Sequence, residues 1–403
     1  MQRTIRFAIL TALLLLTSIH TQAWRGMYMP RLRVEGRHLK DPAGNIIKLH
    51  GYAQTFSPWF NERGKRWNNY DVEGCLEYNK RIIDGIMEAG WMMNFVRMHM
   101  DPYWSNTPGR RVKGENDISA FDFNRFAKYL DEVFIPMAEY AISQGLYVVM
   151  RPPGVCPEKI AVGDEYQQYL IKVWQHVASH KKLKNHPCIM FELANEPINI
   201  LGSDNSYGGW SKAHFEQLSI YFQKIVDTIR GEGCNNILWI PGLGYQSKYA
   251  GYATYPIKGK NIGYAVHIYP GWFGSSHSYE AFRKGWQEDV QPVGDFAPIM
   301  ITEMDWADKK YEASWGKAHT GVAGDKNFGA NFKKITDDAE NVSWLLFTSP
   351  EHLAAFKDEP AENGNYTFLN DPEACPWPVY HWYQEYARDN YPKKKRGLFH
   401  FDR

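Results

Sequence analysis

The sequence predicts an α/β protein folded as a closed (β/α)8 TIM barrel with long loops on its C-terminal face. Short apolar runs rich in β-forming residues alternate with longer stretches of helical period. Eight such runs can be placed, and none is followed by the glycine-rich turn typical of an open, dinucleotide-binding sheet. No linker rich in Pro, Gly or Ser interrupts the alternation, so we expect residues 24–403 to form a single domain.

The eight strands are expected at residues 46–51, 94–100, 146–151, 188–193, 237–241, 263–269, 299–303 and 342–347. Helices are expected between them, among others at 73–89, 121–144, 165–182, 212–230 and 327–340. Gly90, Gly145 and Gly231 directly follow three of these stretches, as left-handed helix caps do. Residues 32–41 are predicted to form a small hairpin that plugs the bottom of the barrel.

The first 23 residues have the pattern of a cleavable export signal. Arg3 and Arg6 give a positive start, residues 7–16 form an apolar run, and Thr21-Gln22-Ala23 resembles a small-residue cleavage site. The apolar run is too short to span a bilayer. We therefore expect a secreted or periplasmic protein without a membrane anchor.

Composition narrows the class of ligand. The chain has 46 Lys+Arg against 45 Asp+Glu, and this balance argues against a nucleic-acid partner, which normally requires a basic face. Aromatic residues reach 15%, more than a core needs, and such rings suit stacking on sugars. We expect a monomer that acts on a polysaccharide or oligosaccharide.

The sequence carries no motif for a metal or cofactor. It has neither Cys-x-x-Cys nor His-Glu-x-x-His, no phosphate-binding loop and no Gly-x-Ser-x-Gly. The five cysteines are few and widely spaced, so at most two disulfides can form. We expect no cofactor.

Two glutamates follow strands on opposite sides of the predicted barrel. The strand at 188–193 leads into Ala194-Asn195-Glu196-Pro197, and the strand at 299–303 ends in Glu303. Cleavage of a glycosidic bond with retention needs such a pair, one carboxyl as acid and the other as nucleophile, about 5–5.5 Å apart. A single glutamate at a strand end could equally be a structural ion-pair partner.

Five segments in the right order resemble glycoside hydrolase family 5, the cellulase family of retaining clan A. They are Asn94-Phe95-Val96-Arg97, residues 191–197 with the sequence FELANEP, His267-Ile268-Tyr269, Ile301-Thr302-Glu303, and Trp344. The resemblance implies Glu196 as acid/base and Glu303 as nucleophile. It further implies that Arg97 and Tyr269 hold the nucleophile, that Asn195 binds the sugar 2-hydroxyl, that His267 lines the cleavage subsite and that Trp344 forms its stacking floor.

Physical arguments accompany these roles. An arginine fork lowers the pKa of a neighbouring carboxyl, and a buried tyrosine hydroxyl usually finds an acceptor. His267 and Trp344 could instead be core residues, since both lie within apolar strands.

One segment departs from the family pattern. Members usually end the third strand with a histidine, whereas here Arg151 stands there, followed by Pro152-Pro153. His99 could replace the imidazole or serve in packing. The departure leaves the catalytic pair intact and bears on the substrate.

Tryptophans on polar loops are the remaining candidates for sugar contact. Indoles there can form platforms for pyranose rings; the alternative is that some of them attach their loops to the barrel. The candidates are Trp59, Trp104, Trp210, Trp272 and Trp306.

The expected function is a retaining glycosidase without a cofactor, most simply an endo-β-1,4-glucanase or related hemicellulase. An exo-acting member that removes a terminal or side-chain sugar, of the arabinofuranosidase or galactofuranosidase type, is the alternative enzyme. A catalytically silent carbohydrate-binding protein is the alternative from another class, but it would not need two glutamates supported by Arg97 and Tyr269.

Overall fold

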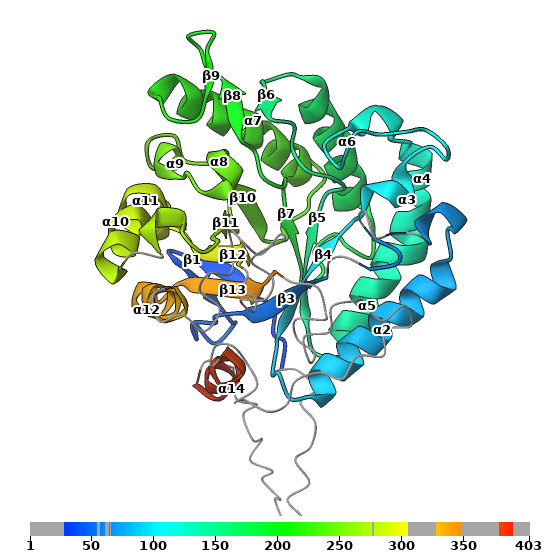
Figure 1. Ribbon diagram of the computed structural model, residues 1–403, viewed down its shortest axis with the longest axis horizontal. Coiled ribbons are helices and arrows are strands. Elements are labelled where there is room, and N and C mark those ends of the chain that lie inside the picture. The colour runs from blue at the N-terminus through cyan, green and yellow to red at the C-terminus, as the bar shows by residue number, and fades with distance from the viewer. Residues whose placement is uncertain are drawn as a thin grey trace, which may run out of the picture.

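The computed structural model describes residues 28–54, 57–60, 64, 66–275, 278–304, 328–347 and 379–389. Eight parallel strands close into a barrel in chain order, and helices surround it (Figure 1). The barrel strands are β3 (His50–Gln54), β4 (Phe95–His99), β5 (Tyr147–Arg151), β7 (Ile189–Glu192), β10 (Leu238–Pro241), β11 (Ile262–His267), β12 (Ile299–Glu303) and β13 (Val342–Leu346). The predicted fold class is therefore confirmed.

The long helices that cover the barrel are α2 (Val72–Glu88), α4 (Phe123–Tyr129), α5 (Ile135–Ser143), α6 (Glu165–Ser179), α7 (Lys212–Gly231), α10 (Tyr279–Asp289), α12 (Gly329–Ala339) and α14 (Val379–Asp389). Short helices occupy the connections: η2 (Trp67–Asn69), α3 (Pro102–Ser105), η3 (Ile118–Ala120), η4 (Leu130–Phe134), α8 (Leu243–Gln246), α9 (Ala250–Thr254), η5 (Trp272–Gly274) and α11 (Gln291–Gly294). A small sheet of β6 (Lys159–Ile160), β8 (Asn199–Leu201) and β9 (Tyr207–Gly208) stands beside the connection that follows β7.

Seven of the eight predicted strands agree with the structure to within two residues at each end. The first does not, because β3 begins at His50, four residues after the predicted start. The apolar residues Ile47 and Leu49 that suggested the strand are buried in the cluster at the bottom of the barrel instead. The apolar run thus leads into the strand and forms part of the floor beneath it.

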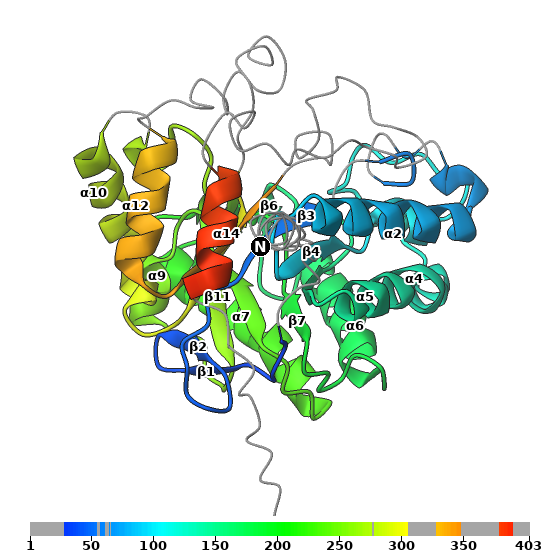
Figure 2. The same cartoon turned by 90° about the horizontal axis from the view of Figure 1, so that it is seen from below.

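A hairpin closes the lower end of the barrel, as predicted. Strands β1 (Arg33–Glu35) and β2 (His38–Lys40) pair antiparallel, and Figure 2 shows them below the barrel. Leu32 and Leu39 pack into one apolar cluster with the barrel interior. The lower end is therefore filled with apolar side chains, which leaves the upper end of the strands for chemistry.

The predicted helix over 121–144 is wrong in one respect, because it is interrupted by a π-helical turn. Helix α4 passes into η4, five residues of π-helix, and then into α5. Pro136 lies in the first turn of α5 and has no N–H to donate to the preceding turn, so the α-helical ladder cannot continue across it.

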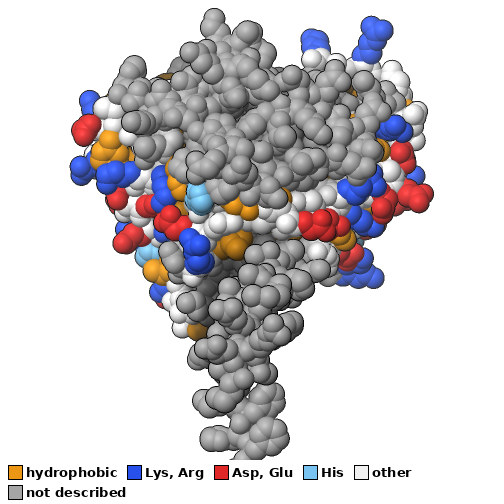
Figure 3. All heavy atoms as spheres, turned by 60° about the horizontal axis from the view of Figure 1, so that its bottom comes forward, with side chains coloured by type: hydrophobic (Ala, Val, Ile, Leu, Met, Phe, Trp, Pro, Cys, Tyr) orange, Lys and Arg blue, Asp and Glu red, His pale blue; other side chains and the backbone are white. Residues whose placement is uncertain are grey.

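Charges on the described surface are mixed in sign. Figure 3 shows acidic and basic side chains interspersed around the described part of one face. Within the described ranges, no helix combines the length and the apolar character needed to cross a membrane. Cys75, Cys156, Cys188 and Cys234 are buried and unpaired, whereas Cys375 and the predicted export signal lie outside the described residues.

Trp344 corrects an expectation about the site. The resemblance implied a stacking floor for sugar, but this side chain is only 1% exposed and points from β13 into the layer between barrel and helices. Its ring lies 5.2 Å from His50, 5.4 Å from Phe332 and 5.1 Å from Tyr383, measured between centroids. The indole is thus enclosed by protein side chains, and no sugar can stack on it.

We predict that Trp344→Ala lowers the free energy of unfolding by roughly 3–5 kcal/mol, because it leaves a cavity among buried rings. Urea unfolding followed by circular dichroism measures the change. Trp210→Ala is the control, since Trp210 is 63% exposed and its loss should barely alter stability. Wild-type stability of Trp344→Ala together with a raised KM would return this residue to the substrate site.

Candidate active site

The side chains inside the barrel change from apolar to charged towards its upper end. Lower inward positions are filled by Phe95, Tyr147, Met190, Ala265 and Met300. Two residues further along, β4, β7 and β11 direct Arg97, Glu192 and His267 inward. On β5 the inward residue at this level is Val149, and Arg151 follows it at the end of the strand. Period-two alternation along each strand thus presents a charged layer on top of an apolar one.

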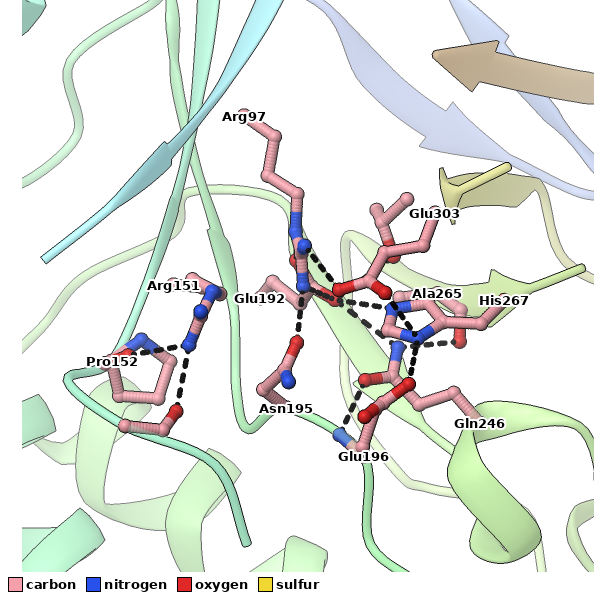
Figure 4. A network of polar contacts seen from close by, with 12 residues as sticks. Arg97, Arg151, Pro152, Glu192, Asn195, Glu196, Gln246, Ala265, His267 and Glu303 are labelled. Carbon is pink, nitrogen blue, oxygen red and sulfur yellow. Dashed lines mark hydrogen bonds and ion pairs between the residues drawn. The ribbon is translucent and has the colours of Figure 1, made fainter. Parts of the chain in front are cut away.

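Arg97 joins three other segments at the centre of this layer. Its Nε and Nη2 atoms donate to the two carboxylate oxygens of Glu192 at 2.5 and 3.0 Å. Nη1 donates to Glu303 Oε1 at 2.8 Å, and Nη2 also donates to Asn195 Oδ1 at 2.6 Å (Figure 4). The side chains of Arg97 and Glu192 are 2% and 0% exposed. Such charge-assisted, bidentate bonds fix the guanidinium and all three of its partners.

Glu303 reaches the upper end of the barrel because of a local irregularity in strand pairing. Ile301 pairs with Val266, but the next pair is Glu303 with His267, so Thr302 is an extra residue on β12. Without this bulge, alternation would direct Thr302 inward and Glu303 outward. With it, Thr302 Oγ1 donates to Glu192 Oε1 at 2.9 Å, and Glu303 still faces the charged layer.

The carboxylate of Glu303 is held in its ionised form. Burial alone would raise its pKa, but the charges of His267 and Arg97 and the hydroxyl of Tyr269 outweigh burial and bring the pKa below its ordinary value. Tyr269 Oη donates to Glu303 Oε2 at 2.5 Å, opposite the oxygen bound by Arg97. A carboxylate fixed through both oxygens and kept charged has the properties that a nucleophile needs.

Glu196 stands beside Glu303 in an uncommon backbone conformation. Its φ of 55° lies in the left-handed region, which costs a non-glycine residue energy and is concentrated at functional sites. Its Oε1 lies 3.0 Å from His267 Nδ1, and His267 Nδ1 lies 3.4 Å from Glu303 Oε2. One oxygen of each glutamate and a His267 nitrogen all lie within 4.8 Å of one another.

His267 links the two glutamates. Burial by itself would lower its pKa, but the neighbouring Glu303, Glu192 and Glu196 raise it above the ordinary histidine value. The three atoms of Glu196, His267 and Glu303 have a spacing that would also suit a metal ion. We assign no metal to this cluster, because hydrogen bonds and ion pairs already account for its arrangement.

Three members of the site were not predicted from the sequence as site residues: Glu192, Gln246 and Thr302. A charged side chain inside an otherwise apolar strand is a signal that could have revealed Glu192, since a buried carboxylate needs a cation. Gln246 and Thr302 carry no such signal, because their contacts with Glu192 depend on the closed barrel.

His99 and Arg151 lie at the edge of the same layer. Arg151 is 6% exposed and donates to the carbonyl of Gly154 at 2.7 Å. Glu115 lies 3.7 Å from Arg151 Nη2 and 3.8 Å from His99 Nε2. Burial, followed by the charges of Arg151 and Arg97, lowers the pKa of His99 well below its ordinary value, so this imidazole is neutral. Both residues remain predicted substrate contacts.

Two of the loop tryptophans are not substrate platforms. Trp59 is 3% exposed and packs against Tyr78 of α2, and Trp104 is fully buried with its Nε1 donating to Trp59 O at 3.0 Å. Tyr70 and Tyr129 cover the rest of Trp104. These indoles attach the connections after β3 and β4 to the helices, so the prediction that they bind substrate is wrong.

The other loop tryptophans differ among themselves. Trp210 is 63% exposed, and Lys248 Nζ lies 4.5 Å from its ring centroid. Trp272 is half-buried with its ring edge-on to Tyr269, 5.4 Å between centroids, which places it next to the residue that holds Glu303. Trp306 lies outside the described residues. Trp210 and Trp272 therefore remain candidates for sugar contact.

Comparison with known proteins identifies the family of this chain. The model of the family described as Cellulase (glycosyl hydrolase family 5) matches residues 60–328, more than half of the chain. The chain belongs to glycosyl hydrolase family 5. Within that family's matched region lie Arg97, Asn195, Glu196, His267, Tyr269 and Glu303.

Individual relatives are distant. Endoglucanase A of Paenibacillus barcinonensis is 27% identical over 247 residues, covering 46% of this chain and 59% of that protein. Cellulase CelDZ1 of Thermoanaerobacterium sp is 25% identical over 63% of this chain and 55% of its own length. The chain thus spans a little over half the length of these two relatives. A beta-glucanase from Saccharophagus degradans, solved in complex with cellotetraose, shares the fold with a TM-score of 0.61 and 16% identity, covering 90% of this chain and 95% of that one.

The Arg97–Glu192 pair predicts how stability depends on pH. Burial would raise the pKa of Glu192, but the charge of Arg97 holds it well below the ordinary value. A carboxyl with a lowered pKa in the folded state contributes stability at neutral pH and loses that contribution as the pH falls into the acid range. Glu192→Gln should therefore lower the free energy of unfolding by about 3–5 kcal/mol at ~pH 7 and by less at ~pH 4.

Chemical unfolding at the two pH values measures this effect. Glu77→Gln is the control, because Glu77 forms an exposed pair with Lys80 and its side chain is 51% exposed. An equal loss for Glu192→Gln at both pH values would contradict the assigned ionisation.

Proposed function

We propose that this protein is a retaining β-glycosidase, an endo-β-1,4-glucanase or a closely related hemicellulase. The observation that carries the proposal is that Glu303, ionised and hydrogen-bonded by Arg97 and Tyr269, lies next to Glu196. One carboxylate oxygen of Glu303 and one of Glu196 lie within 4.8 Å of each other. Retaining enzymes have their two carboxyls about 5–5.5 Å apart, whereas inverting enzymes separate them by about 6.5–9.5 Å to admit a water. The short separation therefore favours retention.

In the first step Glu303 attacks the anomeric carbon and Glu196 gives a proton to the departing glycosidic oxygen. The C–O bond to the leaving sugar breaks as the bond to a Glu303 oxygen forms, and this yields a glycosyl-enzyme. Arg97 and Tyr269 aim Glu303 before substrate arrives, so little reorganisation is needed during the attack.

In the second step Glu196, now ionised, takes a proton from water, whose oxygen attacks the anomeric carbon and releases Glu303. His267 Nδ1 lies 3.0 Å from Glu196 Oε1 and holds this carboxyl beside the reacting bond in both steps. Asn195, oriented by Arg97, is in position to bind a sugar hydroxyl next to the reacting carbon.

The choice of a β-glucan rests on the family and on the exposed rings near Glu196. Relatives named endoglucanase and cellulase support a cellulose-like backbone. Trp210 and Tyr245, 63% and 47% exposed, offer surfaces for sugars beyond the cleaved bond. We further propose that the mature protein begins near residue 24 and acts outside the cytoplasm as a monomer.

The two glutamates should respond differently to substitution. Glu303→Ala should abolish hydrolysis while retaining oligosaccharide binding, because the nucleophile is lost and the binding surface is not. Glu196→Ala should lose roughly 10²–10⁴-fold on natural sugars, the usual contribution of general acid catalysis, yet hydrolyse aryl glycosides with activated leaving groups far better. Steady-state kinetics on both substrate types measure this contrast, and full activity of Glu303→Ala would remove the assigned nucleophile.

Product analysis separates the remaining alternatives. Digestion of cellulose derivatives, mixed-linkage glucan, xyloglucan, mannan, xylan and arabinoxylan, followed by chromatography, should give a ladder of oligosaccharides from one backbone. A single monosaccharide would instead support the exo-acting alternative, and binding without any product would support the silent binding protein. Proton NMR of the first products should show the β-anomer, whereas the α-anomer would contradict retention.

A further inference from the structure

The amide side chain of Gln246 holds the backbone of Glu196. It is fully buried and lies in α8, in the connection after β10. Its Oε1 accepts the Glu196 backbone N–H at 2.8 Å, and its Nε2 donates to Glu192 Oε1 at 3.1 Å and to Ala265 O at 3.2 Å. Figure 4 shows the amide beside Glu196 and below His267. One side chain thus joins the proposed acid/base, the anchor of Arg97 and strand β11.

The orientation of this amide is determined by its surroundings. One side of the group faces an N–H donor, and the other faces a carboxylate and a carbonyl, both acceptors. Rotating the amide by half a turn would bring donor against donor and acceptor against acceptor. Only the observed orientation gives a hydrogen bond to all three surrounding groups.

The backbone around both residues is unusual. Glu196 has φ 55°, and Gly244, Tyr245 and Gln246 have φ 58°, 60° and 58°, three left-handed residues in succession. The two segments are joined further, since Tyr245 N donates to Pro197 O at 3.0 Å and Gly244 N to Ile198 O at 3.1 Å. A glutamate keeps a left-handed backbone only where surrounding contacts hold it there. Gln246 provides such a contact, because its Oε1 accepts the backbone N–H of Glu196.

We infer that Gln246 is a positioning residue for the acid/base glutamate, fixing the left-handed backbone from which Glu196 reaches the glycosidic oxygen. Without this amide the Glu196 N–H is left buried and unpaired, and its backbone can relax towards the commoner right-handed region. Relaxation would carry the carboxyl away from His267 Nδ1 and from the leaving oxygen. Glu303 would be less affected, since its own contacts to Arg97 and Tyr269 do not involve Gln246. This inference rests on the function proposed above.

The test is Gln246→Met, which keeps the length of the side chain and removes both polar ends. The kinetic probes are a cello-oligosaccharide, whose leaving group needs protonation, and a dinitrophenyl β-cellobioside, whose leaving group needs little. We expect kcat/KM on the oligosaccharide to fall by roughly 10–100-fold, the usual effect of a misplaced catalytic group, with a much smaller change in kcat/KM on the aryl substrate. Azide, which replaces activated water, should accelerate the variant on the aryl substrate more than it accelerates wild type.

Gln167→Met is the matched control. Gln167 is 2% exposed, its Nε2 donates to Tyr221 O at 2.8 Å, and its Oε1 accepts from Gly163 N at 2.7 Å, but it lies on α6 away from the charged layer. Gln167→Met should lose about as much stability as Gln246→Met. Its ratio of activity on the oligosaccharide to activity on the aryl substrate should equal that of wild type. If Gln246→Met does not fold, Gln246→Asn keeps the amide but shortens its reach, and it should show the same bias in weaker form.

The outcomes are distinct. Equal losses on both substrates, or the same bias in Gln167→Met, would overturn the positioning role while leaving the proposed function intact. Failure of the wild-type protein to cleave either substrate would instead refute the proposed endo-β-1,4-glucanase activity.

Discussion

The buried guanidinium of Arg97 is the interaction on which the rest of the site depends. It binds Glu192 at the end of β7, Glu303 at the end of β12 and Asn195 next to Glu196, so these three side chains are positioned by one guanidinium. Removing a charge of this kind from water is costly, and only the two carboxylates repay the cost. Their presence explains why the inward layer above Phe95 and Met190 can be polar in a barrel that is otherwise packed with apolar side chains.

The same constraint separates the behaviour of the two proposed catalytic carboxyls. Glu303 is surrounded by donors and cations and is 5% exposed, whereas the Glu196 side chain is 21% exposed and has its partner His267 on one side only. A carboxylate enclosed by donors remains charged, while one at the edge is able to exchange a proton with a substrate oxygen or with water. The surroundings of the two glutamates therefore fit the different roles proposed for them, nucleophile for Glu303 and acid/base for Glu196.

Sequence reasoning succeeded where the pattern along one strand was sufficient. Seven strand positions followed from apolar runs. The contact between Arg97 and Glu303 was implied by the family resemblance, not by the runs themselves. It failed at Trp344, because strands of a parallel barrel are apolar on both faces and their inward positions cannot be read from alternation. The predicted substrate roles of Trp59 and Trp104 were wrong for a related reason. An indole in a polar connection can pack either against sugar or against a helix, and the sequence does not distinguish the two. The role of Gln246 could not be predicted from the sequence, because its hydrogen-bond partners come from β7, β11 and the segment after β7.

The bond partners of Arg97 also bear on the order in which the chain can acquire its fold. Arg97 is synthesised 95 residues before Glu192 and 206 residues before Glu303. A nascent barrel that ended before β12 would have six of its eight strands and Glu192 to balance the guanidinium, but its upper layer would lack Glu303, Thr302 and the closing strands. Water would enter that open edge and solvate the charges. Closure of the last strands therefore excludes this water and brings Glu303 beside Glu196, so the proposed catalytic pair is complete only in the closed barrel.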